Sequence, residues 1–543
     1  MACAVDRPIE RPNILLIVAD DIGYTDVGAY GGEIATPNID ALAAAGVQLT
    51  QFHVAPNCGP TRGAMLSGVD YHIAGMGGNP EVAAGNQRGQ PGYEGHLSNR
   101  VVTMGELLRD SGYHTYMTGK WHLGHDERNL PSGRGFERSF ALANGGASHW
   151  ADQNALVPGS TTRYVEGGEI VAELPTDFYS TTYYTDRIIE FISENAGDRT
   201  PFFAYLSYTA AHNPLHAPAE YIAKYRGTYD GGWDALAAER VERLRSLGLL
   251  TDSHRAHPRP GWILAWDELT PEQQAARARD MEVYAAMIDY MDESIGRVLE
   301  YLRESGEYDN TLIVFLSDNG PSRTTILDYL ALGGAAGDFF GQFDNGLDNK
   351  GLPNSSGDIG PGWAYAAAAP HRLFKGYVTQ GGIQTPGIVK LPTSMPGNTG
   401  RIAVPTHVMD LLPTFLEAAG TDYPDRYLGT EVAPLEGHSL LPLLQGESTA
   451  IFAERGLGWE AYGMDAYRRG DWKVVRLPEP YGNGAWQLYN LAEDPGEVTD
   501  LAGQRPDLVA ELSLAWEQYA ESSGVIRPDQ PIAYAKPAAP GKF

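Results

Sequence analysis

Residues 13–21 read Asn13-Ile14-Leu15-Leu16-Ile17-Val18-Ala19-Asp20-Asp21, an unbroken apolar run that ends in two acidic residues. A run of this length and character is typical of a parallel β-strand buried on both faces. Open α/β sheets bind ligands at the carboxyl ends of such strands, so we expect Asp20 and Asp21 at that edge. One of them could simply cap the next turn. Two adjacent carboxylates repel each other unless a cation joins them, however, which favours a binding role.

A second run of the same kind begins at Thr311. It reads Thr311-Leu312-Ile313-Val314-Phe315-Leu316-Ser317, which predicts another buried strand, and Asp318-Asn319 follows it directly. Two strands with this ending bring three carboxylates and one amide to one edge of the sheet. Oxygen ligands without thiol or imidazole suit Ca²⁺ or Mg²⁺ better than Zn²⁺. The predicted ligands of this cation are Asp20, Asp21, Asp318 and Asn319.

A turn that leads into a helix surrounds Cys58. It reads Asn57-Cys58-Gly59-Pro60-Thr61-Arg62-Gly63-Ala64-Met65-Leu66-Ser67-Gly68. Pro60 suits a first helical turn, and good helix formers follow it, so Cys58 is expected at a helix N-terminus. The helix dipole favours an anion there and lowers the pKa of a thiol, and Arg62 would share the face of Cys58 about one turn later. The alternative is a buried cysteine beside a surface arginine.

Cations and imidazoles follow other predicted strands. Lys120 and His122 come after a strand predicted over 113–118, and in extended backbone their side chains point the same way. His212 comes just past a further predicted strand, which places it at the same edge of a parallel sheet. Lys375 lies in a glycine-containing loop. Taken alone, each of these side chains is also compatible with an ordinary solvated surface position.

Composition restricts the class of protein. The chain has 543 residues and a formal net charge of −29, which argues against nucleic acid or an anionic membrane surface as a partner. An anion-binding site in such a chain must therefore be locally basic. The two cysteines, Cys3 and Cys58, provide no disulfide framework. The start of the chain lacks the pattern of a secretory signal, and no apolar run is long enough to span a bilayer, so we predict a soluble cytoplasmic protein.

The order of predicted elements indicates an α/β fold with two parts. Most of the chain predicts a large mixed, mostly parallel sheet sandwiched by helices, with the charged stretch over 221–279 expected as exposed helix. Aromatic-rich strands over 471–477 and 485–490, followed by a helix over 506–522, predict a smaller C-terminal α+β domain with a small antiparallel sheet. The expected boundaries are 10–454 for the catalytic domain, 455–528 for the C-terminal domain and 529–543 for a tail.

Together these motifs resemble the type I, formylglycine-dependent sulfatases, and bacterial arylsulfatases of the alkaline phosphatase superfamily in particular. The family's Cys-X-Pro-X-Arg signature is matched by Cys58, Pro60 and Arg62, and Gly59 and Thr61 occupy variable positions. The resemblance spans nearly the whole chain. The other matching landmarks, in order, are Asp20-Asp21, Gly119-Lys120-Trp121-His122-Leu123-Gly124, His212, Asp318-Asn319, Lys375, Trp486-Gln487-Leu488-Tyr489-Asn490 and Asp494-Pro495-Gly496-Glu497.

The resemblance implies a modified residue, a metal ion and a set of catalytic side chains. A formylglycine-generating or other sulfatase-maturing enzyme is expected to convert Cys58 to Cα-formylglycine (3-oxoalanine). The implied Ca²⁺ ligands are Asp20, Asp21, Cys58, Asp318 and Asn319. The implied catalytic residues are Cys58, Arg62, Lys120, His122, His212 and Lys375.

The resemblance also implies a reaction in two steps. One hydroxyl of the hydrated aldehyde at residue 58 attacks sulfur and displaces the alcohol or phenol, and the second hydroxyl then expels sulfate. Ca²⁺, Lys120, Lys375 and Arg62 offset charge on the sulfonyl oxygens and the nucleophile. His122 is the candidate base. His212 and Lys375 are the candidates that protonate the leaving oxygen.

Aryl sulfates are the expected substrates, but alternatives remain. An alkyl or carbohydrate sulfatase, or a phosphonate monoester or phosphodiester hydrolase of the same superfamily, shares these motifs. A catalytically silent metal-binding relative would lack the nucleophile or the cation ligands, and both are present here. The loops over 144–177 and 321–369 are expected to select the natural substrate, which the motifs do not identify. Trp150, Tyr179 and Trp363 suggest an apolar or aromatic pocket, or they serve only in packing.

Overall fold

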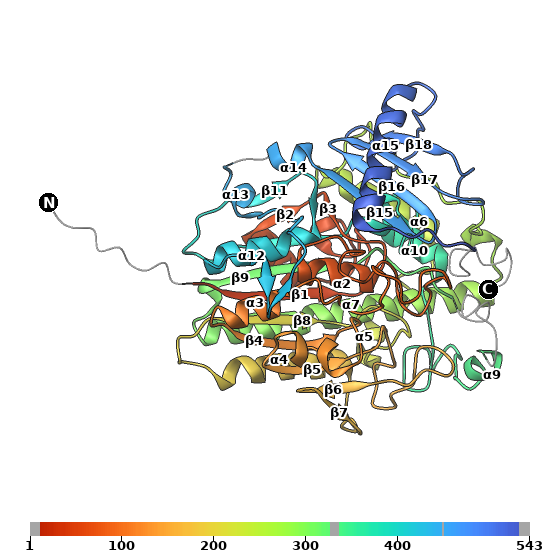
Figure 1. Cartoon of the computed structure of the whole chain (residues 1–543). Helices are drawn as coiled ribbons and strands as arrows, with labels where there is room; N and C mark the ends of the chain where they lie inside the picture. The colour runs from red at the N-terminus through yellow and green to blue at the C-terminus, as the bar shows by residue number, and fades with distance from the viewer. Residues whose placement is uncertain (1–10, 326–335, 448–449, 531–543) are drawn as a thin grey trace.

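The structure, a computed structural model, describes residues 11–325, 336–447 and 450–530 and has a ten-stranded sheet at its centre (Figure 1). In spatial order the strands are β11 (Gly400–Ile402), β2 (Val47–Leu49), β10 (Gly387–Lys390), β9 (Thr311–Ser317), β1 (Asn13–Ala19), β8 (Phe202–Ser207), β4 (His114–Lys120), β5 (Arg138–Leu142), β6 (Tyr164–Glu166) and β7 (Glu169–Val171). The strands from β9 to β5 are parallel, whereas β10 and β6 are antiparallel to their neighbours. The predicted mixed sheet with a mostly parallel centre is therefore confirmed.

Neighbouring residues of β8 show that helices cover both faces of the sheet. Phe203 contacts Phe415, with ring centroids 6.0 Å apart. Phe202 points to the opposite face and contacts Tyr116, which also contacts Phe191. On one face, Phe415 belongs to α12 (Leu411–Ala419), which contacts α2 (Cys58–Ser67) and α3 (Met104–Asp110). On the other face, Phe191 belongs to α4 (Ser180–Glu194), which contacts α7 (Pro271–Glu304). Helix α7 also contacts α1 (Pro37–Ala45).

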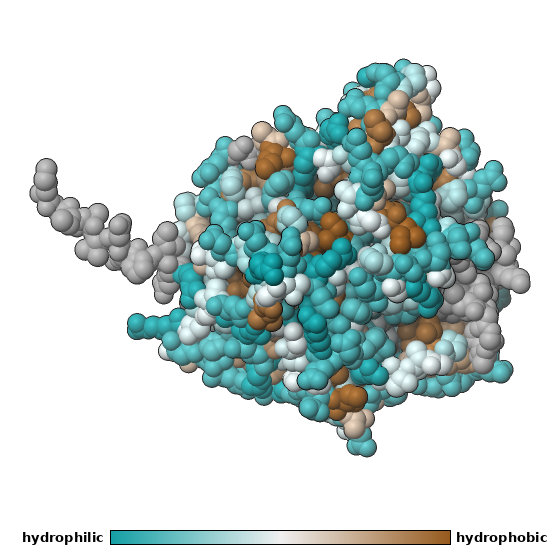
Figure 2. Space-filling model, in the orientation of Figure 1, coloured by the Kyte–Doolittle hydropathy of each residue, from teal (hydrophilic) through white to brown (hydrophobic). Residues whose placement is uncertain are grey.

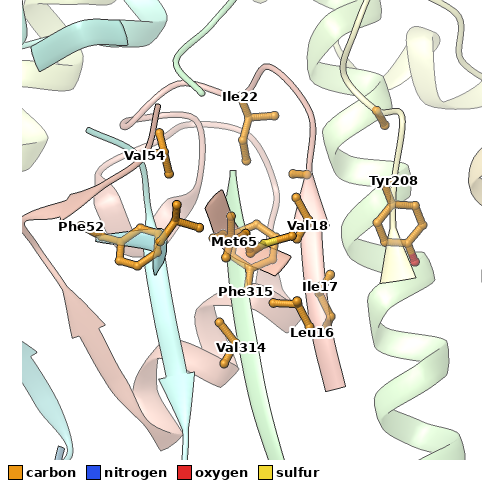
Figure 3. Packing of buried hydrophobic residues seen from close by; sticks show 14 of the residues in the cluster. Leu16, Ile17, Val18, Ile22, Phe52, Val54, Met65, Tyr208, Val314 and Phe315 are labelled. Carbon is orange, nitrogen blue, oxygen red and sulfur yellow. The ribbon is translucent and has the colours of Figure 1, made fainter. Parts of the chain in front are cut away.

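The main apolar core lies between the central strands and these helices. Figure 3 shows Val18 of β1, Phe315 of β9 and Met65 of α2 in one cluster, and all three are fully buried. Each such side chain stabilises the fold by roughly 1.5–3 kcal/mol relative to an exposed position. Every residue of β1 is buried. This burial explains why residues 14–19 are all apolar and why the first carboxylates come only after the strand ends.

The prediction of exposed helix over 221–279 is confirmed only in part. The structure has α5 (Ala219–Lys224) and α6 (Gly232–Ser246), and α7 begins only at Pro271. Pro258 and Pro260 interrupt the segment between them, and Thr270 starts α7 with a capping box to Gln273. Other short elements are α9 (Ala336–Phe340), α10 (Gly360–Ala368), α11 (Gln380–Ile383), α13 (Leu441–Leu444), α14 (Ala450–Glu454), β3 (Phe52–His53), β12 (Thr406–His407), β13 (Arg426–Tyr427) and β14 (Thr430–Glu431).

The outer surface is mainly hydrophilic. Figure 2 shows small, separate apolar patches on a polar face. Scattered apolar residues of this kind are normal on proteins in water. Within the described ranges, no helix combines the length and apolar character needed to cross a bilayer.

A separate four-stranded antiparallel sheet lies near the C-terminus, above the main sheet in Figure 1. The predicted small antiparallel sheet with one helix is confirmed, and two further strands precede the two that the sequence indicated. The division of the chain at residue 454 stays a prediction. The elements of this part are β15 (Gly456–Ala461), β16 (Met464–Arg469), β17 (Trp472–Arg476), β18 (Trp486–Asn490) and α15 (Pro506–Ser523).

A buried polar cluster joins this sheet to the residues that follow α2. We call it the His72 cluster, and it comprises Asp70, Tyr71, His72, Glu460 and Tyr519. His72 Nδ1 lies 2.8 Å from Asp70 Oδ1, and its Nε2 lies 3.8 Å from Glu460 Oε2. The Tyr519 hydroxyl donates to Asp70 Oδ2 at 2.8 Å. Burial disfavours a charged imidazole, but Asp70 and then Glu460 raise the pKa of His72 to about 9. His72 is therefore charged at neutral pH.

Replacing His72 with glutamine is expected to lower the free energy of unfolding most at neutral and acidic pH. The raised pKa makes the folded state bind a proton that the unfolded chain releases above pH of about 6.5. This stabilisation, on the order of 3 kcal/mol, is fully present below that pH and is lost as the pH rises through about 9. Denaturant unfolding of both proteins at about pH 6 and about pH 10 measures the difference. A difference that stays the same at the higher pH contradicts the prediction.

Candidate active site

Four neighbouring parallel strands bring polar side chains to one edge of the main sheet. Because β9, β1, β8 and β4 run in the same direction, their carboxyl ends lie together, where open α/β sheets hold their ligands. The structure thus brings together residues that lie as much as 299 positions apart in the sequence. This edge carries Asp20 and Asp21 after β1, Asp318 and Asn319 after β9, Lys120 and His122 from β4 and the following turn, and His212 after β8.

Cys58 is the first residue of α2 and faces this edge. Asn57 precedes the helix in extended conformation, and Gly68 ends it with φ of 70°. All ten residues of α2 are buried. A side chain at position 59 would meet Asn79 Oδ1 and Met76 Cε at 2.8 Å, so glycine there lets the start of α2 approach its neighbours. The local sequence therefore presents Cys58 at a buried helix N-terminus, as predicted.

Three buried ion pairs lie beneath Cys58. Arg62 donates through Nε to Asp318 Oδ2 at 2.9 Å, and through Nη1 to the carbonyl of Lys120 at 2.8 Å. Lys120 Nζ donates to Asp20 Oδ2 at 2.6 Å. The third pair joins Lys375 Nζ and Asp21 Oδ1, 2.5 Å apart. Buried pairs of this kind are stable only while both partners remain, because a single buried charge is costly.

The carboxylate cluster has oxygens left for a cation. Asp20 Oδ1, Asp21 Oδ2 and Asn319 Oδ1 are buried and accept no hydrogen bond. Possible ligand atoms of Asp20, Cys58 and Asp318 lie within 4.8 Å of one another, as do those of Asp20, Asp21 and His212. Burial and the neighbouring Asp318 raise the pKa of Asp20 well above its ordinary value. These residues therefore fit a hard cation that binds oxygen and relieves the crowding of negative charge.

His122 links Cys58 to an acidic residue that sequence reasoning missed. Its Nδ1 lies 3.4 Å from Cys58 Sγ, and its Nε2 lies 3.3 Å from both carboxylate oxygens of Glu81. Burial opposes ionisation, but Glu81 and Cys58 raise the pKa of His122 to about 9. Burial likewise opposes a thiolate, but Lys120 and Lys375 lower the pKa of Cys58 to about 6. The arrangement can therefore hold and move a proton at residue 58.

Two loop residues complete this arrangement. Asn79 Nδ2 lies 3.7 Å from Cys58 Sγ, and its Oδ1 accepts from the backbone N–H of Gly59 at 3.2 Å. Glu81 follows two residues later in a loop without regular periodicity. A carboxylate in such a loop carries no signal that separates it from other surface acids. Both residues could be found only from the folded chain.

His212 holds its proton away from the acidic cluster. Its Nδ1 donates to the carbonyl of Asn213 at 2.6 Å, and its Nε2 lies 3.6 Å from Asp21 Oδ2. Burial lowers the pKa of His212 well below its ordinary value, although Asp21 opposes this effect. The imidazole is therefore neutral at pH 7, with its free lone pair on Nε2 directed toward Asp21.

A cavity of about 190 Å³ opens above these groups. Cys58, His122, His212 and Lys375 line it, whereas Lys120 and Arg62 are fully buried behind them. The other polar lining residues are Asn79, Glu81, Asn144, Ser160, Asn213 and Thr324, and the larger apolar or aromatic ones are Val82, Leu156, Val157 and Tyr462. Four of the six predicted catalytic residues therefore line the cavity, and Lys120 and Arg62 do not.

The aromatic residues that suggested a pocket serve in packing instead. Trp363 is fully buried on α10, with its ring 5.6 Å from that of Trp233. Trp150 contacts Tyr179 at 4.7 Å between ring centroids. None of the three predicted aromatic residues lines the cavity described above. Their spacing in the sequence held no information about which way they point.

A family model for sulfatases matches residues 12–421 of the chain. This protein belongs to the sulfatase family. An uncharacterised sulfatase of Schizosaccharomyces pombe is 41% identical over 537 residues, which cover 96% of each chain. The arylsulfatase of Klebsiella aerogenes is 41% identical over 440 residues, which cover 79% of this chain and 91% of that relative.

Solved structures show the same fold. The crystal structure of Ps i-CgsB in complex with k-i-k-neocarrahexaose has 24% identity and a TM-score of 0.67, and the match covers 96% of this chain and 95% of that one. At this identity the likeness concerns the fold. Family membership makes the protein a sulfuric ester hydrolase, so the sulfatase hydrolyses sulfate esters. The candidate site of that reaction is the edge of the sheet that Cys58 faces from the start of α2.

Proposed function

We propose that this sulfatase hydrolyses sulfate monoesters of phenols, with Cys58 oxidised to Cα-formylglycine and Ca²⁺ bound by the acidic cluster. One observation carries the proposal. Cys58 lines a cavity together with His122 and Lys375, and its sulfur lies within 4.8 Å of possible ligand oxygens of Asp20 and Asp318. A nucleophile, a base, a cation and a metal site are thus assembled around one small space.

His122 and Glu81 are the proposed proton-transfer residues for the nucleophile. The hydrated aldehyde at residue 58 supplies one hydroxyl that attacks sulfur and a second that allows sulfate to leave. The hydrated aldehyde is neutral, so it lacks the thiolate charge that helps to raise the pKa of His122. We assign to the neutral form of His122 the role of taking the proton of the attacking hydroxyl, and Glu81 stabilises the imidazolium that results. The distances of 3.4 Å from Cys58 to His122 and 3.3 Å from His122 to Glu81 support these roles.

The three cationic side chains of the site have two different roles. Lys375 lines the cavity and stabilises negative charge on the sulfonyl oxygens, whereas Lys120 and Arg62 act from behind by holding Asp20 and Asp318 in place. If Ca²⁺ is bound there, it would supply positive charge to the same oxygens and to the nucleophile. Its proposed ligands are Asp20, Asp21, Asp318, Asn319 and residue 58. Lys375 protonates the leaving oxygen more readily than His212. The proton of His212 is on Nδ1, which donates it in a hydrogen bond to the carbonyl of Asn213.

The apolar walls support an aryl group on the substrate. Val82, Leu156 and Val157 line the cavity, and burial of a phenyl ring against such side chains is favourable. The Klebsiella aerogenes relative is itself named an arylsulfatase. Among the described residues that line the cavity, the only Lys or Arg is Lys375. A polysulfated sugar would need further cations, so a carbohydrate substrate is the weaker alternative.

Steady-state kinetics with matched esters test this proposal. We expect kcat/KM for 4-nitrophenyl sulfate to exceed those for ethyl sulfate, a glucosamine 6-sulfate and a 4-nitrophenyl phosphonate monoester by about tenfold or more. A higher value for the phosphonate would support the phosphonate monoester hydrolase alternative. A higher value for the sugar sulfate would replace the aryl assignment. The protein should be produced with a sulfatase-maturing enzyme, because residue 58 must be modified first.

The location of the protein is a separate proposal. The cytoplasmic position expected from the sequence and the encounter there with a maturation enzyme stay predictions. Fractionation of the native cells, followed by immunoblotting, tests the location directly.

Replacing Glu81 with glutamine is expected to lower kcat by about 10- to 100-fold, because a neutral amide stabilises protonated His122 less well. The matched control is Glu137→Gln. Glu137 also lies 3.3 Å from a histidine, His114, and is similarly exposed, but His114 begins β4 at the opposite edge of the sheet. Steady-state kinetics on an aryl sulfate compare both variants. Equal effects of the two substitutions contradict the role of Glu81.

A further inference from the structure

We propose that Tyr462 is a specificity-determining residue that packs its ring against the organic group of the sulfate ester. This inference rests on the proposed arylsulfatase function and adds a residue from the C-terminal sheet to the site. Tyr462 is 8% exposed and lines the cavity that also contains Cys58 and His122. It is the only residue of the C-terminal sheet that lines this cavity in the described part of the chain.

A tight hairpin turn brings Tyr462 to the cavity. Ala461 pairs with Met464 at the ends of β15 and β16, so the connection consists of Tyr462 and Gly463 alone. Both have positive φ, 57° at Tyr462 and 83° at Gly463. Two-residue turns of this kind strongly prefer asparagine or glycine at the first position. A tyrosine is strained there, and strained residues cluster at functional sites.

The supporting contacts hold the turn in one position. Gly463 N–H donates to Glu460 Oε1 at 2.7 Å, and Glu460 N–H donates to the Tyr71 hydroxyl at 2.8 Å. Glu460 also belongs to the His72 cluster, which joins the C-terminal sheet to the segment after α2. The turn is thus anchored to the segment that follows α2 rather than left as a mobile surface loop.

Other residues of the cavity suit an aromatic group. Val82, Leu156 and Val157 come from two loops of the main part of the chain and line the same cavity. A phenyl ring in this cavity would gain apolar burial against these side chains and contact with the ring of Tyr462. A small alkyl group has less apolar surface to bury and no ring to pack against Tyr462. Tyr462 therefore favours aryl over small alkyl sulfates.

Tyr462→Asn tests the role without disrupting the fold, because asparagine relieves the strain in the turn. We expect KM for 4-nitrophenyl sulfate to rise about tenfold with kcat within about twofold. The kcat/KM for ethyl sulfate should change less than about twofold. Inhibition by benzenesulfonate, which cannot be hydrolysed, should weaken about tenfold, whereas inhibition by inorganic sulfate should not change. Tyr462→Phe keeps the ring and should keep the wild-type ratio of aryl to ethyl kcat/KM.

The chain contains a matched control in another hairpin. Leu428 and Gly429 connect β13 and β14 with φ of 45° and 83°, and Leu428 is 87% exposed. Leu428→Asn relieves the same kind of strain and should leave every kinetic value unchanged. Leu428→Asn should unfold at the wild-type temperature or above it. Tyr462→Asn relieves the same strain but loses the burial of its ring, so its kinetics are measured below its own unfolding temperature.

The outcomes separate this inference from the proposed function. If wild-type protein hydrolyses 4-nitrophenyl sulfate and Tyr462→Asn leaves the ratio of aryl to ethyl kcat/KM within about twofold of wild type, the role of Tyr462 is overturned. Inactivity of the wild-type, modified protein on aryl sulfates would instead overturn the aryl assignment, and the role of Tyr462 with it.

Discussion

Replacing Cys58 with alanine will reduce hydrolysis of sulfate esters by about 10⁴-fold or more. Alanine has no sulfur to oxidise and no atom that can attack the substrate, while the cavity and the carboxylate and amide ligands of the cation stay in place. Removal of a nucleophile commonly costs this much because no other group in the site replaces it. The variant should still fold, since one small buried side chain replaces another and Ala64 and Met65 keep the packing of α2.

The intact mass of the peptide that contains residue 58 completes this experiment. In wild-type protein made with its maturation enzyme, the mass should show that CH₂SH has become an aldehyde, in a fraction that tracks activity. An unmodified thiol in fully active protein would contradict the formylglycine proposal. Cys58 would then be a direct nucleophile, consistent with its lowered pKa of about 6, or a structural residue.

Replacing Asp318 with asparagine will lower kcat/KM by about 10³-fold or more and abolish tight Ca²⁺ binding. Asp318 is fully buried and pairs with Arg62. Asparagine keeps its volume and one acceptor for the guanidinium, so this change is gentler on the fold than alanine. Three measurements apply: calcium per chain by elemental analysis, activity, and the shift of the unfolding temperature on addition of Ca²⁺.

Asp292→Asn is the matched control for this variant. Asp292 is 1% exposed and accepts a hydrogen bond from the backbone N–H of Ile39 at 2.8 Å, away from the site. It should lose stability but keep both calcium and activity per folded molecule. Near-normal activity or calcium content in Asp318→Asn would remove the proposed metal site.

The strands that organise the molecule could be predicted because their patterns are local. β1 and β9 are buried on both faces, so each is an uninterrupted apolar run with polar residues only after its end. The aromatic strands β17 and β18 were recognisable for a similar reason, since alternating and turn residues indicate a hairpin. The helix that begins at Cys58 followed from Pro60 and the residues after it. The prediction of helix over 221–279 is correct only in part, because the stretch between α6 and α7 contains Pro258 and Pro260 and is not helical.

Part of the site could not be predicted because its residues carry no local signal. Glu81 and Asn79 lie in an irregular loop, and Tyr462 lies in a hairpin of a different sheet. Each acquires its position only when distant segments pack together. Conversely, Trp363 looked like a pocket residue until packing placed it in the core.

Local patterns in the sequence were enough to predict the central strands such as β1 and β9, their acidic endings, the helix that starts at Cys58, and the family. These features depend on short-range periodicity and on a motif of a few residues. The folded chain was needed to show which side chains line the cavity, which cations are buried away from it, and which loop residues contact His122. Those relations depend on contacts between residues far apart in the chain, and no local pattern encodes the distance between them.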